Sequence, residues 1–376
     1  MNDNCERIKK GKMILMNKKE LSDFYQNEIY GFWREGEEVT YELLGPDPKA
    51  SPDYKPASPF EVIGGELVRI RVKADGREGS FIVHAFIPKN TSSGHPFIVC
   101  MHPIMPKDYA LERGYAIFFM ESIQVATDNT ERKGAFYDVH PYGPEHESQT
   151  GVLMAWAWGA SKVLDAVYAG LDKEFNLDPK AAMVTGVSRW GKATAVCGAF
   201  DKRFRMTIPA CSGAGGLALN NYVSEGKTYD FSAIGGPAEY TYTKNEPLSC
   251  LQSDAERGWF NDRFLKYASP ADIPVEQNGL VELAMADDRY YFIIAACTGE
   301  DWVNAPAMWE CYKLADKAYE AAGLADHLVV NFHREGHAVL EEDMMLIIEY
   351  FNHMYYGNEY NGDLAELKTS VFKGQE

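Results

Sequence analysis

Ser188, which lies between two glycines, is the residue of this chain best placed to do chemistry. The apolar run Met183-Val184-Thr185 precedes Gly186, and small residues at helical spacing follow Gly191. A strand, a tight turn and a helix in this order expose a serine hydroxyl at the top of a parallel sheet. Backbone N–H groups at the start of the helix would stabilise negative charge beside that serine. The pattern predicts a nucleophile, and its alternative is an ordinary turn with a capping serine.

The glycine spacing departs from G-x-S-x-G, because Trp190 stands where the second glycine is usual. The longer string carries more information: Gly-Val-Ser-Arg-Trp-Gly-Lys over residues 186–192, then Gly-Ala-Phe-Asp at 198–201, Arg203, and Cys-Ser-Gly-Ala-Gly-Gly at 211–216. It resembles the glucuronoyl esterases, the carbohydrate-esterase group within the α/β-hydrolases. The resemblance implies that Ser188 is the nucleophile, that Arg189 helps to hold the oxyanion, and that Lys192 contacts the uronic acid of the substrate.

A serine nucleophile needs a base to accept its proton, and in this fold the chain order is serine, acid, histidine. His337 comes just after the last predicted strand and before the closing helix, in Arg-Glu-Gly-His-Ala-Val. We therefore predict that His337 is the base. His333, four residues earlier, is the competitor and is interpreted as a packed or surface histidine.

The acid departs from the better-known form of the family, in which a glutamate precedes the Ser-Gly-x-Gly-Gly turn. Cys211 holds that place here. Some relatives carry the acid after the seventh strand instead, where this chain has Glu300 and Asp301. We predict Asp301 as the acid and Glu300 as the second choice. The alternative for both is a helix N-cap and first-turn role.

The resemblance also suggests side chains that contact substrate. Trp302, Gln252 and Glu256 correspond to substrate-contacting positions; the alternatives are core packing for Trp302 and a solvated loop for the other two. The oxyanion site should combine the Arg189 backbone N–H with a second donor, plausibly its own guanidinium. Family members have Gly-Asn-His after the first parallel strand, whereas residues 101–104 here are Met-His-Pro-Ile, which puts a donor from that loop in doubt.

The elements that must position these residues follow from the hydrophobic pattern. Two-fold alternation and a glycine-containing turn predict an antiparallel hairpin over residues 66–87. From residue 96 onward, buried strands alternate with helices, which indicates a parallel sheet. The strands are expected at 96–101, 114–120, 183–185, 204–208, 290–297 and 327–332, and the helices at 20–33, 151–171, 193–199, 305–322 and 339–356. The predicted fold class is α/β: an α/β-hydrolase three-layer sandwich, with a mostly parallel central sheet and helices on both faces.

The domain organisation follows from the same survey. Residues 1–60 are predicted to be an N-terminal extension packed on the main domain, and residues 61–376 the α/β-hydrolase catalytic domain. The irregular stretch 217–285 is expected to be an insertion that covers the pocket. The long polar segment 121–150 has no periodicity and should be a functional loop above the carboxyl edge of the sheet.

Composition limits the partners. The net charge of −18 argues against nucleic acid and anionic membrane. Seven cysteines form no C-x-x-C pair, no metal-binding spacing is present, and no apolar segment has the length of a signal peptide or membrane span. We expect a cytoplasmic protein without metal or cofactor, whose partner is a small-molecule or oligosaccharide uronate ester.

Together the residues and the resemblance predict a serine carboxylic-ester hydrolase that cleaves esters of (4-O-methyl-)glucuronate through an acyl-enzyme intermediate. An acetyl xylan esterase, or another esterase of carbohydrates or small molecules, would use the same triad without needing Lys192. A third interpretation is a catalytically inactive binding protein that kept the hydrolase fold after losing its acid to Cys211.

Overall fold

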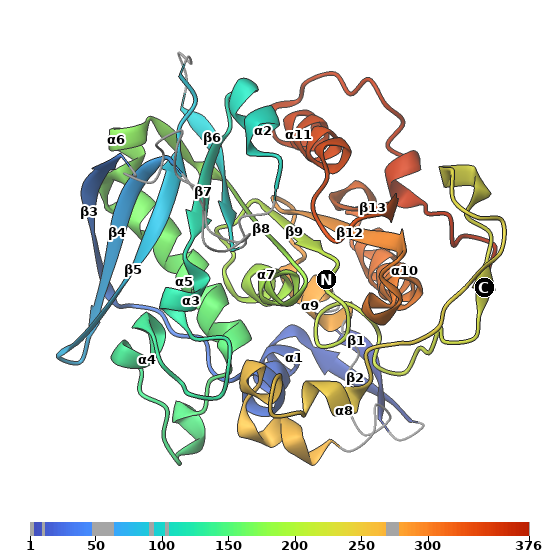
Figure 1. Ribbon diagram of the computed structural model, residues 1–376, viewed down its shortest axis with the longest axis horizontal. Helices are drawn as coiled ribbons and strands as arrows, with labels where there is room; N and C mark the ends of the chain where they lie inside the picture. Colours follow the sequence, from blue (N-terminus) through green and yellow to red (C-terminus); the bar gives the residue numbers. More distant parts are fainter. Residues whose placement is uncertain are drawn as a thin grey trace.

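The computed structural model describes residues 4–9, 12–46, 64–89, 94–101, 105–267 and 278–375. Its centre is a nine-stranded sheet in the order β13-β12-β9-β8-β6-β7-β5-β4-β3. Figure 1 shows this sheet running from β3 at one edge to β13 at the other. The strands are β3 (Glu38–Pro46), β4 (Glu66–Ala74), β5 (Arg77–Phe86), β6 (His95–Cys100), β7 (Ala116–Met120), β8 (Leu177–Val187), β9 (Met206–Ala210), β12 (Tyr290–Thr298) and β13 (Leu328–Glu335).

The core of the sheet is parallel. Strands β7, β6, β8, β9, β12 and β13 pair in parallel, whereas β3, β4, β5 and β7 pair antiparallel. Every residue of β7 and of β12 is buried, as continuous apolar runs such as Tyr-Tyr-Phe-Ile-Ile-Ala-Ala-Cys require when helices cover both faces. The predicted hairpin is confirmed as β4 and β5, with the inward side chains Val68, Ile70 and Val72 buried.

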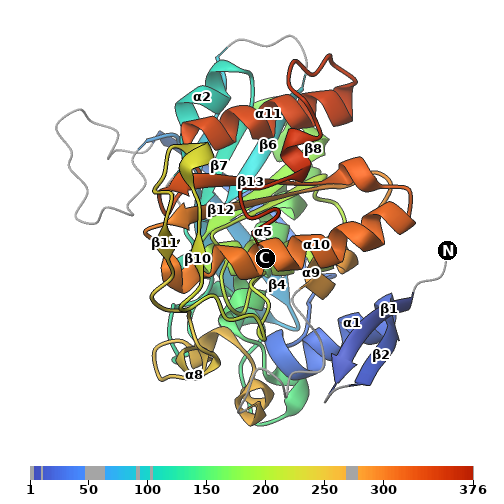
Figure 2. The ribbon, with the colours of Figure 1, turned by 90° about the vertical axis from the view of Figure 1, so that its right-hand side faces the viewer.

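Helices cover both faces of the sheet. Helices α2 (Lys107–Glu112) and α11 (Glu341–Tyr356) pack together on one face, and α5 (Val152–Ala166), α7 (Arg189–Phe200), α9 (Asn278–Ala284) and α10 (Ala305–Ala321) form the other layer. Figure 2 shows α2 and α11 on one side of the strands and α9 and α10 on the other. The predicted three-layer α/β sandwich is therefore confirmed. None of the helices in the described ranges is long and apolar enough to cross a membrane.

The segment before residue 60 does more than pack on the main domain, which corrects the predicted boundary. It begins with a separate hairpin of β1 (Asn4–Lys9) and β2 (Lys12–Asn17), followed by α1 (Lys18–Phe24) and the π-helix Tyr25–Tyr30. Strand β3 then adds the edge strand to the main sheet by pairing with β4. The Pro-rich passage at residues 45–59 has the composition of a loop, and its residues 47–59 lie outside the described residues.

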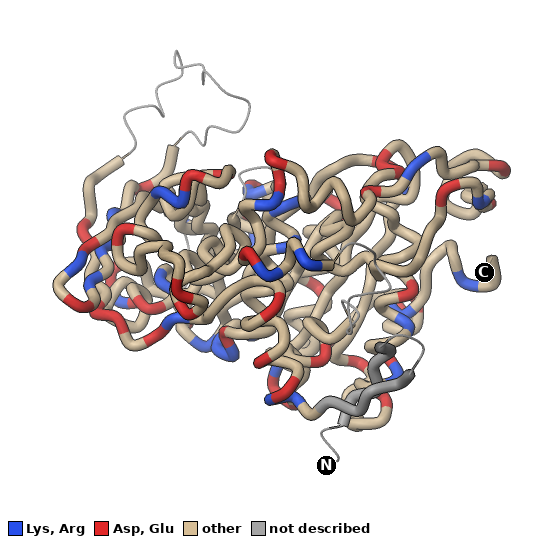
Figure 3. Tube along the Cα trace, turned by 90° about the horizontal axis from the view of Figure 1, so that it is seen from below, with Lys and Arg blue, Asp and Glu red and all other residues tan. Residues whose placement is uncertain are grey.

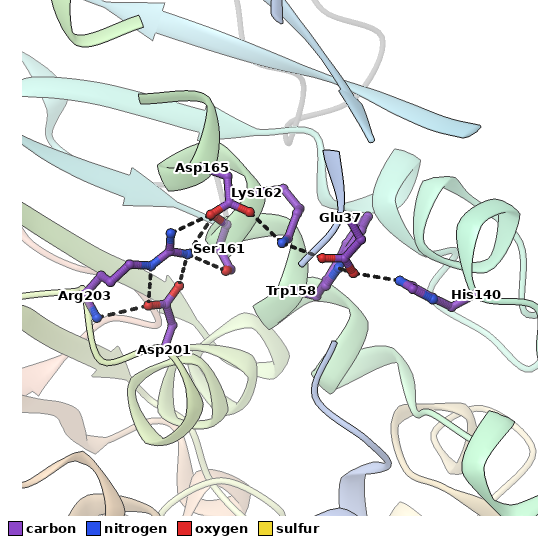
Figure 4. A network of polar contacts seen from close by, with 8 residues as sticks. All are labelled: Glu37, His140, Trp158, Ser161, Lys162, Asp165, Asp201 and Arg203. Atoms are coloured by element: carbon purple, nitrogen blue, oxygen red, sulfur yellow. Dashed lines mark hydrogen bonds and ion pairs between the residues drawn. The ribbon is translucent and has the colours of Figure 1, made fainter. Parts of the chain in front are cut away.

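A buried ion pair holds this segment in place just before β3. Glu37 and Lys162 of α5 lie 2.9 Å apart, and both side chains are 2% exposed. Glu37 also accepts hydrogen bonds from Trp158 (2.9 Å) and His140 (2.8 Å). Burial alone would raise the pKa of Glu37, but His140, the Lys162 charge and Trp158 outweigh it and hold that pKa well below its usual range. The network continues through Lys162 to Asp165 (Figure 4).

The irregular stretch after β9 covers the carboxyl end of the sheet. It contains the short pair β10 (Thr228–Tyr229) and β11 (Tyr240–Thr241) and the single turn α8 (Leu248–Leu251). The predicted insertion ends earlier than expected, because α9, which lies within residues 217–285, packs on α7 and α10 as part of the helical layer.

The remaining short helices, α3 (Ser122–Val125), α4 (Ala135–Val139) and α6 (Asp172–Phe175), lie in connections. In the view of Figure 3, acidic and basic residues are interspersed along the trace.

Candidate active site

The nucleophile turn has the strained geometry that its sequence predicts. Ser188 joins β8 to α7 with φ 63° and ψ −128°, a conformation that non-glycine residues rarely adopt. Its N–H donates to the Ala210 carbonyl of the neighbouring strand at 3.0 Å. Such strain persists only where the surrounding structure imposes it, and it is concentrated at functional sites. The turn therefore presents Ser188 in the manner of a nucleophile elbow.

Two glycines permit this turn. A Cβ atom at Gly186 would lie 2.6 Å from the Trp190 carbonyl oxygen, and one at Gly191 would lie 2.3 Å from the Ala210 carbonyl oxygen. Both distances are too short for any side chain. The displaced second glycine of the motif is therefore the residue that lets α7 approach β9.

His337 has a carboxylate partner, and that partner is Glu300. Nδ1 of His337 lies 2.9 Å from Oε2 of Glu300, and the two side chains are 29% and 14% exposed. The distance is that of a hydrogen bond, although the two groups are not aligned as one. Hydrogen bonds of catalytic groups are often misaligned before substrate binds. The ring of Trp302 lies beside the histidine, with 5.7 Å between centroids.

Asp301, our first choice for the acid, forms hydrogen bonds with residues of the covering segment. Its Oδ1 accepts a hydrogen bond of 2.6 Å from the Tyr240 hydroxyl, and its Oδ2 accepts two of 2.8 Å from the backbone N–H and the hydroxyl of Thr243. The side chain is buried. Asp301 thus fastens the covering segment to the end of β12, and its neighbour Glu300 is the carboxylate that reaches His337.

The surroundings of the pair shift both pKa values. Burial, and then repulsion from Asp301, raise the pKa of Glu300 to about 7, against an opposing effect of Lys244. Burial, and then the cations Lys192 and Arg189, lower the pKa of His337. A lowered pKa keeps imidazole in its neutral, proton-accepting form at neutral pH. Because the two groups are in contact, they should titrate as a pair.

Cys211, at the family's glutamate position, cannot replace this acid. It lines the same cavity as Ser188, but it is buried. Burial raises the pKa of its thiol to about 12, so it carries no charge at neutral pH.

A second histidine supports the turn that carries His337. Nε2 of His333 lies 2.9 Å from the Gly336 carbonyl oxygen, and Nδ1 lies 3.0 Å from Oδ2 of Asp343. Since both neighbours are acceptors, both ring nitrogens donate only when His333 is protonated. Asp343 is fully buried and also accepts from Asn331 and from the Leu340 N–H, each at 2.7 Å. His333 is therefore a packed residue that holds the His337 turn.

This arrangement predicts a pH-dependent stability. Burial would lower the pKa of His333, but the hydrogen bond and charge of Asp343, with the Gly336 carbonyl, outweigh it and raise that pKa. A raised folded-state pKa stabilises the protein fully below the unfolded value of about 6.5, and the effect disappears as pH rises through the folded value. In thermal unfolding, His333→Gln should lower Tm most below about pH 6.5 and progressively less above it. A Tm difference that stays constant with pH would exclude a charged His333.

A cavity of about 290 Å³ opens beside Ser188. Its walls come from the nucleophile turn, from the Cys211 turn, from the covering segment and from the end of β12. They are formed by Ser188, Arg189, Lys192, Cys211, Gly213, Lys244, Asn245, Glu246, Pro247, Cys250, Glu256, Trp259, Trp302 and Val303. Trp302, 36% exposed, thus lines the cavity as its resemblance implied.

Lys192 reaches this cavity as a fully hydrogen-bonded ammonium group. Nζ donates to the carbonyl oxygens of Ser212 (2.9 Å) and Ala214 (2.7 Å) and to Oε2 of Glu246 (2.9 Å). An ammonium group has three donors, and all three are used. Lys192 therefore fixes the turn at residues 212–214. Glu246, which the sequence analysis did not identify, neutralises the charge of Lys192. A substrate hydroxyl that approaches Lys192 must share or displace one of these contacts.

The other two suggested contacts differ from each other. Glu256 lines the cavity, and its buried Oε2 has no hydrogen-bond partner among the described residues. Burial, and then the charge of Glu246, raise its pKa. Gln252 instead donates to the Phe264 and Tyr267 carbonyl oxygens at 3.1 and 2.5 Å, and it is not part of the cavity wall. Gln252 thus serves the covering segment, which corrects its suggested role.

The oxyanion donors centre on Arg189. Its N–H lies in the first turn of α7, where backbone donors have no helical acceptor. The backbone N–H of Met101, after β6, is already used by the Thr185 carbonyl at 3.0 Å, and residues 102–104 lie outside the described ranges. The Arg189 guanidinium is bound by Asp128, a residue without a motif that could have revealed it.

Comparisons with known proteins identify the family of this chain. The family described as glucuronyl esterase of fungi matches residues 70–323. A carbohydrate esterase family 15 glucuronoyl esterase from Caldicellulosiruptor kristjansonii is 30% identical, with a TM-score of 0.80 over 94% of this chain and 87% of that one.

Two curated relatives are longer. A multidomain esterase of Ruminococcus flavefaciens is 43% identical over 363 residues, which are 94% of this chain and 45% of the relative. A 4-O-methyl-glucuronoyl methylesterase of Hypocrea jecorina is 28% identical over 282 residues, which are 73% of this chain and 55% of the relative. The chain spans about half the length of these relatives. With the family match, the elbow and the fold in agreement, the chain belongs to the glucuronoyl esterase family, carbohydrate esterase family 15.

Proposed function

We propose that this chain is a serine esterase that hydrolyses esters of glucuronate or 4-O-methyl-glucuronate. The observation that carries the proposal is Ser188, held at a strained elbow in the wall of a 290 Å³ cavity that Lys192 and Trp302 also line. Family membership and the activity named for the Hypocrea jecorina relative support the choice of ester.

In the proposed reaction the Ser188 hydroxyl oxygen attacks the ester carbonyl, and His337 accepts the hydroxyl proton. Glu300 stabilises the imidazolium, and Arg189 stabilises the oxyanion. The tetrahedral intermediate breaks its bond to the alcohol, which leaves with the proton from His337. A water molecule then gives a proton to His337 and attacks the acyl-enzyme, which releases the uronic acid and returns the proton to Ser188.

The cavity chemistry suits a neutral sugar ester. The charge of Lys192 is paired with that of Glu246, and burial, with the charge of Glu246, raises the pKa of Glu256. Trp302 offers a half-exposed ring on which a sugar face could stack.

The test is a comparison of kcat/KM for methyl glucuronate, methyl 4-O-methyl-glucuronate and 4-nitrophenyl acetate, with fluorophosphonate labelling of Ser188. We expect labelling of the wild type and preference for the glucuronate esters. Glu246→Gln and Lys192→Ala should weaken glucuronate hydrolysis more than acetate hydrolysis. Faster cleavage of acetate, unchanged in these variants, would instead indicate an acetyl esterase. Absence of both labelling and hydrolysis would indicate a binding protein.

A further inference from the structure

Asp128 lies between the nucleophile turn and the covering segment. It follows α3, and its side chain is 20% exposed. Its Oδ2 lies 2.5 Å from Nη1 of Arg189, and its Oδ1 accepts a hydrogen bond of 2.7 Å from Nε1 of Trp259. One carboxylate therefore holds two walls of the cavity, which come from segments far apart in the sequence.

The Arg189 side chain depends on such a partner for its orientation. It is 40% exposed, and a long charged side chain loses rotamer entropy when it is fixed. Its guanidinium carbon lies 5.3 Å from the centre of the Trp259 ring and 5.7 Å from that of Trp190. The rings confine the guanidinium, and Asp128 supplies its counter-charge. Donors stabilise an oxyanion well only when they are oriented before the reaction.

The loop that carries Asp128 is itself fixed. Trp156, in the buried helix α5, donates to the Ala126 carbonyl at 2.9 Å, and the Asn129 N–H donates to the Thr127 carbonyl at 2.8 Å. A Cβ atom at Gly258 would lie 2.4 Å from the Asn129 carbonyl oxygen, so the loop and the covering segment pack backbone to backbone.

Arg132 adds a clamp from the same loop. It donates to the carbonyl oxygens of Gly258 and, at 3.1 Å, Phe260, on either side of Trp259. The carboxylate of Asp128 is thus presented from a rigid frame to both of its partners.

We infer that Asp128 is a positioning residue, which orients the Arg189 guanidinium toward the oxyanion and fixes Trp259 in the cavity wall. This inference rests on the proposed function, because it assigns Asp128 a role only through Arg189 and the cavity. It does not place Asp128 in contact with the reacting atoms.

The test is a double-mutant cycle of Asp128→Asn and Arg189→Ala, measured with 4-nitrophenyl acetate and by the rate of fluorophosphonate labelling of Ser188. Asparagine keeps an oxygen for Trp259 but loses the charge that holds Arg189. Loss of an oxyanion donor costs about 10²–10³ in kcat, and we expect Asp128→Asn alone to cost roughly 10- to 100-fold. KM should change less than about threefold, because the interaction acts on the transition state.

The coupling decides the matter. In the Arg189→Ala background, Asp128→Asn should cost less than about twofold, since its partner is already absent. If Asp128→Asn lowers kcat by the same factor in the Arg189→Ala background as in the wild type, the inference is overturned. A wild-type kcat in the Asp128→Asn variant would overturn it as well. Asp128→Ser gives the same readings should the asparagine variant fail to fold.

Two further variants serve as controls. Glu131→Gln removes another acid of the same loop, one that pairs with Lys133 at the surface, and should leave kcat unchanged. Trp259→Phe removes the indole N–H donor together with part of the ring in the cavity wall, and it should affect KM more than kcat. If the wild-type protein reacted with neither 4-nitrophenyl acetate nor the fluorophosphonate, both the proposed function and this inference would be wrong.

Discussion

Replacing Glu300 by glutamine is expected to lower kcat by about 10³–10⁴, with the fold intact. A glutamine at 2.9 Å from Nδ1 of His337 carries no charge to stabilise the imidazolium, and its amide can favour the wrong tautomer of the ring. Steady-state kinetics on a glucuronate ester or on 4-nitrophenyl acetate would measure the effect. Circular dichroism and Tm would show that the variant is folded.

The adjacent carboxylate provides the matched control. Asp301→Asn replaces one of the two carboxylate oxygens by an NH2 donor, so either Tyr240 or Thr243 loses its acceptor. The variant should have a lower Tm while costing less than about tenfold in kcat. It should also move the acidic limb of the pH profile to lower pH. The reason is that removal of the Asp301 charge lowers the pKa of Glu300, so its carboxylate stays ionised in more acidic solution. If Asp301→Asn were the more damaging change to kcat, Asp301 would be the acid after all.

Loss of His337 is expected to have the largest effect of all. His337→Ala should lower kcat on the order of 10⁶, because without a base the Ser188 hydroxyl is a poor nucleophile. Ser188→Ala should lower it by a similar factor. Since the two residues act as one unit, the double variant should be no slower than either single variant.

This non-additivity is the sharper measurement. If the factors by which the two single substitutions lower kcat multiplied in the Ser188→Ala/His337→Ala variant, the two residues would act independently. A nucleophile and its base do not act independently. His353→Ala, a change in the exposed part of α11, tests the effect of removing a histidine elsewhere and should leave kcat near the wild-type value.

The predictions of Ser188 as the nucleophile and His337 as the base rest on local signals. The elbow around Ser188 is encoded by the residues that build it, and His337 follows from chain order in this fold. Asp301, the first choice for the acid, is not the carboxylate that lies beside His337, because adjacent side chains at the end of a strand diverge. Which of them meets His337 depends on where Tyr240 and Thr243 lie, and those residues belong to a segment without periodicity.

The surroundings of the cavity were hidden for a similar reason. Lys192 was recognised, but its neutralisation by Glu246 depends on the path of the covering segment, 54 residues away. Asp128 is likewise brought to Arg189 by a loop, over a separation of 61 residues. The edge strand β3 was missed because it runs into the Pro-rich passage 45–59, whose composition favours a loop.

The Glu37–Lys162 pair limits how far this protein can be truncated from its N-terminal side. The family match begins at residue 70, and a fragment that started there would keep every residue of the proposed triad. It would nevertheless remove one of the two carboxylates that contact the buried Lys162 ammonium, leaving only Asp165, and it would leave β4 without its neighbour. Breaking a buried pair costs up to about 3–5 kcal/mol, a large part of the stability of a typical domain. The smallest autonomous catalytic unit is therefore expected to be larger than the region that the family model matches.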